Sequence, residues 1–140
     1  MKRRSFLIAL LAPATVQAHS TKLGHIAIGH SWAPPSQQAD GQVFFPIVNN
    51  GTTPDELIAA RSEICSLIEL RENNRYGEAA LKSITLEPGK PAAMRPSARH
   101  LRLIGLNKPL NQGDSFKIVL EFLNAGEIEI EVIVEPSASD

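Results

Sequence analysis

Apolar and polar residues alternate through most of the chain, most clearly over residues 127–134. A period of two places successive side chains on opposite faces of a strand, so this stretch is expected to be a strand with one wet face. Six other segments show a similar pattern. They are residues 23–28, 43–48, 57–60, 66–71, 100–106 and 115–122.

Turn signals separate these segments, among them Asn-Asn-Gly at 49–51, Pro-Gly at 88–89 and Asn-Gln-Gly-Asp at 111–114. Such residues tolerate or impose turn geometry. About seven short strands at this spacing predict an all-β sandwich or barrel in one domain. One helical turn is a weaker expectation for residues 73–81.

The first eighteen residues have the pattern of an export signal. Met1 to Arg4 form a basic head, residues 6–12 form a short apolar run, and a small-x-small site ends at Ala18. This pattern predicts a signal peptide over 1–18 and a domain over 19–140, exported to a bacterial-type periplasm. No later segment reaches the roughly 20 apolar residues of a membrane-spanning helix, so no transmembrane anchor is expected after cleavage.

The leader also fits the twin-arginine pattern, because Arg3 and Arg4 are followed by one free position and then Phe6-Leu7. Paired arginines are common in basic heads, so the general secretory route and the twin-arginine route both stay open.

Charge and cysteine content narrow the function classes. Loss of the leader's three cations lowers the number of Lys and Arg residues from 14 to 11, against 15 acidic residues. The resulting net charge of −4 argues against nucleic acid as a partner.

Cys65 is the single cysteine, so the fold has no internal disulfide. We expect Cys65 to be a buried apolar residue on a strand.

Three blocks together resemble the periplasmic copper chaperone family, the PCuAC-like proteins. They are His-Ser-Trp-Ala-Pro at 30–34, Val-Phe-Phe-Pro-Ile-Val-Asn-Asn-Gly at 43–51, and residues 99–114 with their Gly-Leu-x-x-Pro-Leu-x-x-Gly-Asp cadence. The resemblance implies a cupredoxin-like, Ig-like Greek-key sandwich that carries Cu(I) and passes it to respiratory oxidase assembly. The family's two histidines and two methionines suit Cu(I) because soft thioether and imidazole ligands favour this ion.

Carried over position by position, most of this ligand set is replaced. The family's first histidine falls at Arg71, its methionines fall near Asn73 and Glu78 and at Arg102, and only His100 remains. A guanidinium has no lone pair for a metal. We therefore expect copper binding to be weak, altered or absent. Met94 could be proposed as a substitute ligand, but it is expected to be a core residue on a strand.

The other histidines suggest a second metal hypothesis. His19 would be the first residue after cleavage, and a free amino group with a first-position imidazole chelates Cu(II). His25 and His30 follow closely, although on one strand they would point to opposite faces. The alternative is that His25 and His30 are ordinary polar-face residues and His19 is a frayed end.

The remaining patterns indicate a binding protein and no enzyme, because no serine stands in a nucleophile elbow and no histidines have zincin spacing. Arg95, Arg99 and Arg102 could form a basic patch on one strand. Guanidinium groups bind carboxylates and phosphates, so the alternative function is a periplasmic module that docks an anion or a partner protein through this arginine-rich strand. Trp32 is expected in the core.

Overall fold

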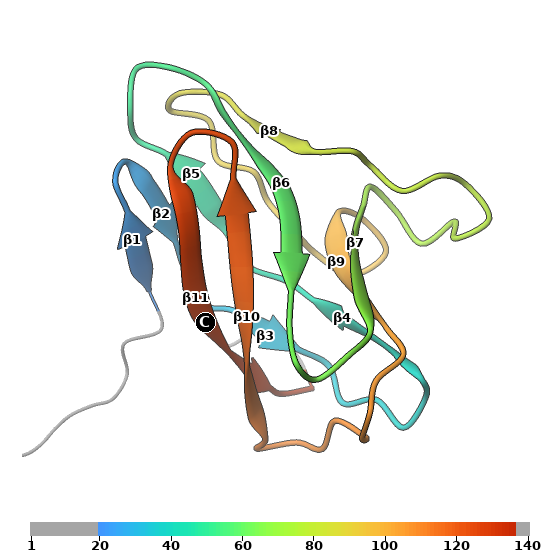
Figure 1. Cartoon of the computed structure of the whole chain (residues 1–140). Coiled ribbons are helices and arrows are strands. Elements are labelled where there is room, and N and C mark those ends of the chain that lie inside the picture. Colours follow the sequence, from blue (N-terminus) through green and yellow to red (C-terminus); the bar gives the residue numbers. More distant parts are fainter. Residues whose placement is uncertain (1–19, 137–140) are drawn as a thin grey trace, which may run out of the picture.

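A computed structural model gives the structure, which describes residues 20–136 (Figure 1). This part of the chain contains eleven strands and no helix. The strands are β1 (Thr21–Leu23), β2 (Ile26–Ile28), β3 (Trp32–Ala33), β4 (Asp40–Val43), β5 (Ile47–Asn49), β6 (Asp55–Arg61), β7 (Leu67–Arg71), β8 (Ile84–Leu86), β9 (His100–Ile104), β10 (Ser115–Phe122) and β11 (Gly126–Val134).

The strands form three sheets. The largest has the order β3-β11-β10-β6-β8, and the two smaller sheets have the orders β4-β9-β7 and β1-β2-β5. The two smaller sheets adjoin, because β4 and β5 are separated by only three residues. Most neighbours are antiparallel and many are distant in sequence, such as β10 with β6 and β4 with β9. The all-β, cupredoxin-like sandwich expected from the sequence is confirmed.

One apolar core lies between the sheets. Its most buried side chains come from the inward faces of the large sheet and of β4-β9-β7, among them Leu57, Leu101, Leu103, Ile118 and Leu120. Trp32 is buried and its ring centroid lies 4.9 Å from that of Phe44, so the expectation of a core tryptophan holds. Burial of apolar surface therefore stabilises the fold.

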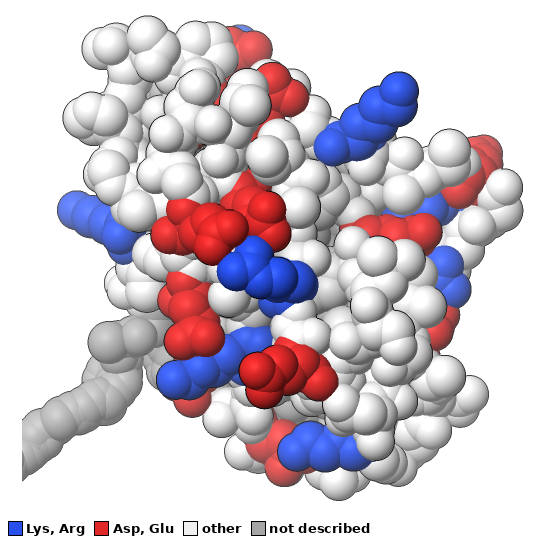
Figure 2. All heavy atoms as spheres, in the orientation of Figure 1, with Lys and Arg blue, Asp and Glu red and all other residues white. Residues whose placement is uncertain are grey.

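The outer face of the large sheet is wet and charged, as the alternation at 127–134 predicts. Arg61 of β6 contacts Glu121 of β10 at 2.6 Å and Glu127 of β11 at 3.0 Å. Figure 2 shows acidic and basic side chains interleaved over these strands. Exposed pairs of this kind each contribute little to stability, so this face has mainly a solubilising role.

Two of the seven expected strands are interrupted. Residues 23–28 form a β1–β2 hairpin instead of one strand, since Gly24 adopts a positive φ of 59° and Leu23 pairs with Ile26. Residues 43–48 are broken at Pro46, where the chain passes from β4 to β5. These two interruptions turn seven expected strands into nine, and β3 and β8 bring the number in the described residues to eleven.

Three smaller expectations are corrected. Cys65 packs against the core half-buried, but it lies in the β6–β7 turn and not on a strand. Met94 also packs against the core, in the connection before β9. Residues 73–81 form a non-helical turn.

The predicted signal peptide over 1–18 and His19 lie outside the described residues. Within residues 20–136, the structure has no helix of the length and apolarity needed to cross a membrane.

Candidate functional site

The outer face of the sheet β4-β9-β7 carries most of the positions assigned to the family's metal site. Arg71 pairs with His100 across β7 and β9, and two residues further along Glu69 pairs with Arg102. Gln42 of β4 pairs with Arg102 from the other side. Because residues two apart share a face of a strand, these five side chains lie together.

His100, the one family ligand that the sequence is expected to retain, is completely buried. Its Nδ1 lies 2.7 Å from the carbonyl oxygen of Ala98, which can only accept, so Nδ1 carries the hydrogen. In the neutral ring Nε2 is then the acceptor, and the hydroxyl of Tyr76 donates to it at 2.8 Å. Gln42 Nε2 donates in turn to the Tyr76 oxygen at 2.9 Å. The lone pair that would bind a metal is thereby engaged.

Two guanidinium groups lie over the Tyr76 ring. The Arg102 Cζ atom is 3.9 Å from the ring centroid and the Arg71 Cζ atom is 5.2 Å from it. Cations over an aromatic face are attracted to it. Arg102 is also paired with Asp40, at 3.1 Å through Nε, and with Glu69 at 3.5 Å. The Tyr76 ring is therefore contacted by guanidinium groups, one of which is itself fixed by ion pairs with Asp40 and Glu69.

Arg71 fixes the loop that presents Tyr76. Its side chain is 3% exposed, and one terminal nitrogen donates to the carbonyl oxygens of Arg75 at 2.8 Å and Glu78 at 3.0 Å. The other terminal nitrogen contacts Glu69 at 3.3 Å. The loop then returns to β7 through a hydrogen bond from Leu81 N to Leu70 O. Arg71, where the family resemblance implies a histidine ligand, thus acts as a staple for the loop.

Electrostatics keeps His100 neutral. Burial lowers its pKa below the ordinary value of 6.5, and the charges of Arg71 and Arg102 lower it further, against the hydrogen bond to Ala98 that raises it. A neutral ring matches the hydrogen-bond pattern, in which Nε2 accepts.

These residues do not fit Cu(I). Two cations flank the position, Tyr76 caps the only imidazole, and Met94, the one methionine among the described residues, packs against the core. Within residues 20–136, no group of three or more His, Cys, Asp or Glu side chains is arranged to hold a metal ion.

The other proposed histidine ligands do not join this site. His25 is exposed in the β1–β2 turn, and His30 follows β2 and lies 3.0 Å from Glu135. The two therefore stand at opposite ends of β2, and the single strand assumed for them is replaced by a hairpin. A site that also involves His19 falls outside the described residues.

The arginine-rich strand is largely neutralised by its neighbours. Arg99 contacts Glu72 at 3.0 Å, and Arg102 pairs with Asp40 and Glu69. Arg95 is exposed on the approach to β9. Of these three arginines, Arg95 is the one without an ion-pair partner within 4.0 Å among the described residues.

Four residues of this site were not expected from the sequence, namely Tyr76, Gln42, Asp40 and Glu69. Tyr76 is the only tyrosine of the chain and lies between Asn73 and Glu78, the positions of two expected methionines. That location was a sequence signal that Tyr76 lies near the site. The other three were identifiable only from strand pairing.

Comparison with known proteins places this geometry in context. Residues 26–134 match the family model "Putative lipoprotein LpqE-like". A curated relative, "Putative lipoprotein Lxx21020" from Leifsonia xyli subsp. xyli, is 21% identical over 132 residues, which cover 91% of this chain and 80% of the relative.

Two solved structures share the fold over most of its length. The copper-bound PCuAC domain from PmoF2 is 27% identical with a TM-score of 0.75, covering 84% of this chain and 97% of that domain. The apo form of the PmoF2 domain is 28% identical with a TM-score of 0.74, covering 86% and 98%.

Proposed function

Because the chain belongs to the LpqE-like family, within the PCuAC-like copper chaperones, we propose that it is an exported copper-chaperone-like protein whose Cu(I) site is closed by its own side chains. Metal binding at this position is weak or absent in the native fold. The protein retains the scaffold of a copper carrier and has lost most of its ligands.

One observation carries this proposal: the Tyr76 hydroxyl lies 2.8 Å from Nε2 of the buried His100. For copper to bind there, the metal would have to replace this hydrogen bond and approach between Arg71 and Arg102. Cation repulsion and the absence of thioether sulfur both oppose Cu(I).

Export and partner belong to the same proposal. The matched family and the curated relative are both described as lipoproteins, which supports a place in the cell envelope for this chain. The leader pattern over 1–18 supports cleavage and release of residues 19–140 into the periplasm. The partner implied by the family resemblance is a protein of respiratory oxidase assembly.

The proposal is tested by competition for Cu(I) between the purified mature protein and a chromophoric Cu(I) chelator under anaerobic conditions. We expect the wild-type protein to leave the chelator's absorbance unchanged at one equivalent. His100→Gln is the matched control and should behave identically, because His100 is not a ligand. Stoichiometric withdrawal of Cu(I) by the wild type that His100→Gln abolishes would refute the proposal.

A further inference from the structure

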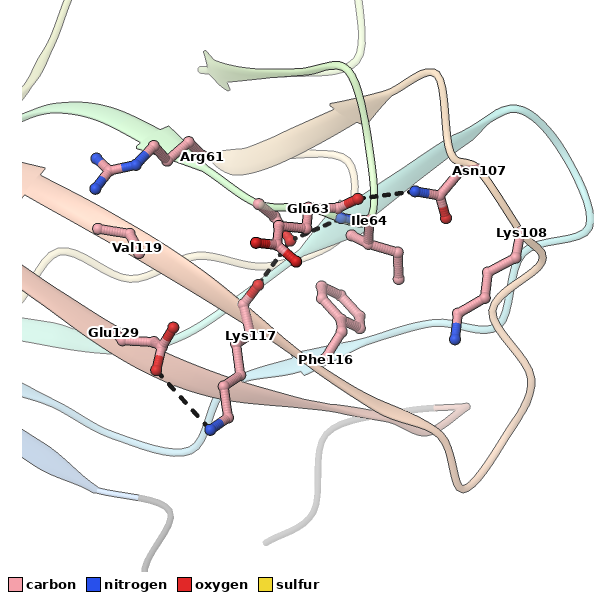
Figure 3. Close-up of a pocket in the computed structure, with 10 residues that line it drawn as sticks. Arg61, Glu63, Ile64, Asn107, Lys108, Phe116, Lys117, Val119 and Glu129 are labelled. Atoms are coloured by element: carbon pink, nitrogen blue, oxygen red, sulfur yellow. Dashed lines mark hydrogen bonds and ion pairs between the residues drawn. The ribbon is translucent and has the colours of Figure 1, made fainter.

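A pocket of about 790 Å³ lies away from the closed site. Its walls are the β6–β7 turn, the connection after β9, and the outer side of β10 and β11 (Figure 3). Neither Tyr76 nor any residue paired with it lines this space. The connection after β9 contains Asn107 and Lys108, part of the block that carries the family resemblance.

Hydrogen bonds fix the walls of this pocket in place. Ser62 Oγ donates to the Lys117 carbonyl oxygen at 2.6 Å, and Asn107 Nδ2 donates to the Glu63 carbonyl oxygen at 2.8 Å. Asn107 N donates to the Ile64 carbonyl oxygen at 2.9 Å. The β6–β7 turn is thus tied to both β10 and the connection after β9, and the pocket is preformed, as small-molecule sites usually are.

The pocket has an apolar floor and a charged rim. Ile64 and Phe116 are nearly buried, and Val119 lines the pocket from the opposite face of β10. On the rim, Arg61 is already paired with Glu121 and Glu127, and Lys117 lies 3.9 Å from Glu129.

Lys108 and Glu63 are the two rim charges left for a ligand. Among the described residues, neither has an ion-pair partner within 4.0 Å. In Figure 3, Ile64 and the Phe116 ring lie between the Glu63 carboxylate and the Lys108 amine. One cation and one anion therefore stand on either side of an apolar surface.

We propose that this pocket binds a small zwitterion with an apolar body, such as a hydrophobic dipeptide. Its carboxylate would pair with Lys108, its ammonium with Glu63, and its side chains would cover Phe116 and Ile64. A purely anionic ligand would meet the Glu63 carboxylate, and a purely cationic one would meet Lys108. Apolar contact supplies most of the affinity, because exposed ion pairs are weak.

The test is an NMR titration of the ¹⁵N-labelled protein, residues 19–140, with L-leucyl-L-phenylalanine. We expect saturable shifts at the amides of Asn107, Lys108 and Lys117. Acetylation of the dipeptide's amine or amidation of its carboxylate should each weaken binding about two- to fivefold. Lys108→Gln should abolish the preference for the free carboxylate, and Glu63→Gln the preference for the free amine.

The matched controls are Lys82→Gln and Glu87→Gln, two exposed residues that do not line the pocket, and both should bind as the wild type does. All four substitutions are on exposed side chains, and unchanged spectra outside the pocket verify folding. Absence of saturable shifts, or equal affinity for free and doubly blocked dipeptide, would overturn the proposal. Either result would leave the closed copper site unaffected, since the two sites share no residue.

Discussion

At the scale of single residues, hydrogen bonds hold the site around His100 in place. Gln42, Tyr76, His100 and the Ala98 carbonyl form one continuous chain of donors and acceptors. A buried polar group costs about 1–3 kcal/mol when its partner is removed, so each member is stabilised by the next. The Tyr76 hydroxyl is therefore a structural group as well as a barrier to metal.

His100 makes stability dependent on pH. Its folded-state pKa lies below 6.5, so the unfolded chain binds the proton first as the pH falls. The contribution of neutral His100 to the free energy of unfolding is complete above about pH 6.5, the pKa of histidine in the unfolded chain. It is lost as the pH falls through the lower pKa of the folded state. We expect the free energy of unfolding in urea to decrease from pH 7 to pH 5, and less steeply in His100→Gln.

A direct check is the chemical shift of the His100 ring in the wild-type protein. A His100 midpoint at or above 6.5 would contradict the proposed neutral ring, whatever the stability of the variant.

Restoring the ligands should raise the affinity for Cu(I), and removal of the Tyr76 hydroxyl should raise it further. Arg71→His, Asn73→Met and Arg102→Met return imidazole and thioether groups to the positions of the family motif. We expect this triple variant to compete better than the wild type for Cu(I), and the quadruple variant with Tyr76→Phe to compete at least tenfold better than the triple, a change of about 1.4 kcal/mol.

The control for this restoration keeps the three substitutions and replaces His100 by Gln, which should return Cu(I) affinity to the wild-type level. If the triple and quadruple variants gain no affinity over the wild type, the position-by-position assignment of the ligands is wrong.

Part of this site could be predicted from the sequence. The motif assignment and a period of two were enough to expect Arg71, His100 and Arg102 near one another. The location of Tyr76 between two expected methionine positions was a signal, but its contact with His100 was not predictable. That contact depends on the loop path that Arg71 fixes through the carbonyls of Arg75 and Glu78. Hydrogen bonds to backbone carbonyls leave no pattern in side-chain polarity.

At the scale of elements, alternation predicts strands well where they are long and pair on both sides. The segment at 115–122 coincides with β10, which lies between β11 and β6. Prediction failed where turns are short. The hairpin between β1 and β2 turns on Gly24 and His25 alone, and two residues are too short a break to separate the strands by their pattern. Residues 84–86 also alternate, but three residues gave too weak a signal.

The turn after β9 should be sensitive to a single methyl group. Gly105 has a φ of 74°, and a Cβ there would lie 2.7 Å from Ser66 Oγ. We expect Gly105→Ala to lower the free energy of unfolding by about 1–2 kcal/mol through the left-handed backbone alone, with crowding added. Urea denaturation monitored by Trp32 fluorescence measures the change.

Two control substitutions separate the cost of the left-handed backbone from the cost of crowding. Gly89→Ala has a similar φ of 76° with no atom near its Cβ, so it should show the backbone cost only. Gly77 has neither a positive φ nor an atom near its Cβ position, so Gly77→Ala should leave the free energy of unfolding nearly unchanged. A loss for Gly105→Ala no larger than that for Gly77→Ala would show that the turn relaxes freely.

At the scale of the whole molecule, one apolar core joins three sheets without a disulfide. The single cysteine, Cys65, is half-buried, and burial raises the pKa of its thiol, which keeps the thiol protonated and poorly reactive. The sequence predicted this dependence on the core from cysteine content alone. The pairing order of the sheets was accessible only through the family resemblance, because long-range strand pairing leaves no local signal.

The export proposal predicts the first residue of the released protein. Mass spectrometry of the protein recovered from the periplasm should give a chain that begins at His19. Cu(II) should then bind at the amino terminus, and His19→Ala should weaken that binding by at least tenfold because the chelate ring is lost. His25→Ala is the control and should change nothing. An identical Cu(II) affinity for wild type and His19→Ala would eliminate the amino-terminal site.

The staple formed by Arg71 has an evolutionary consequence. A lineage that reverted this position to histidine by one mutation would release the loop carbonyls and leave Tyr76 without its support, well before the missing sulfur ligands could return. The intermediate would be less stable than either end point and no better at binding copper. Single substitutions toward a metal site would therefore pass through a less stable protein that has gained no metal affinity.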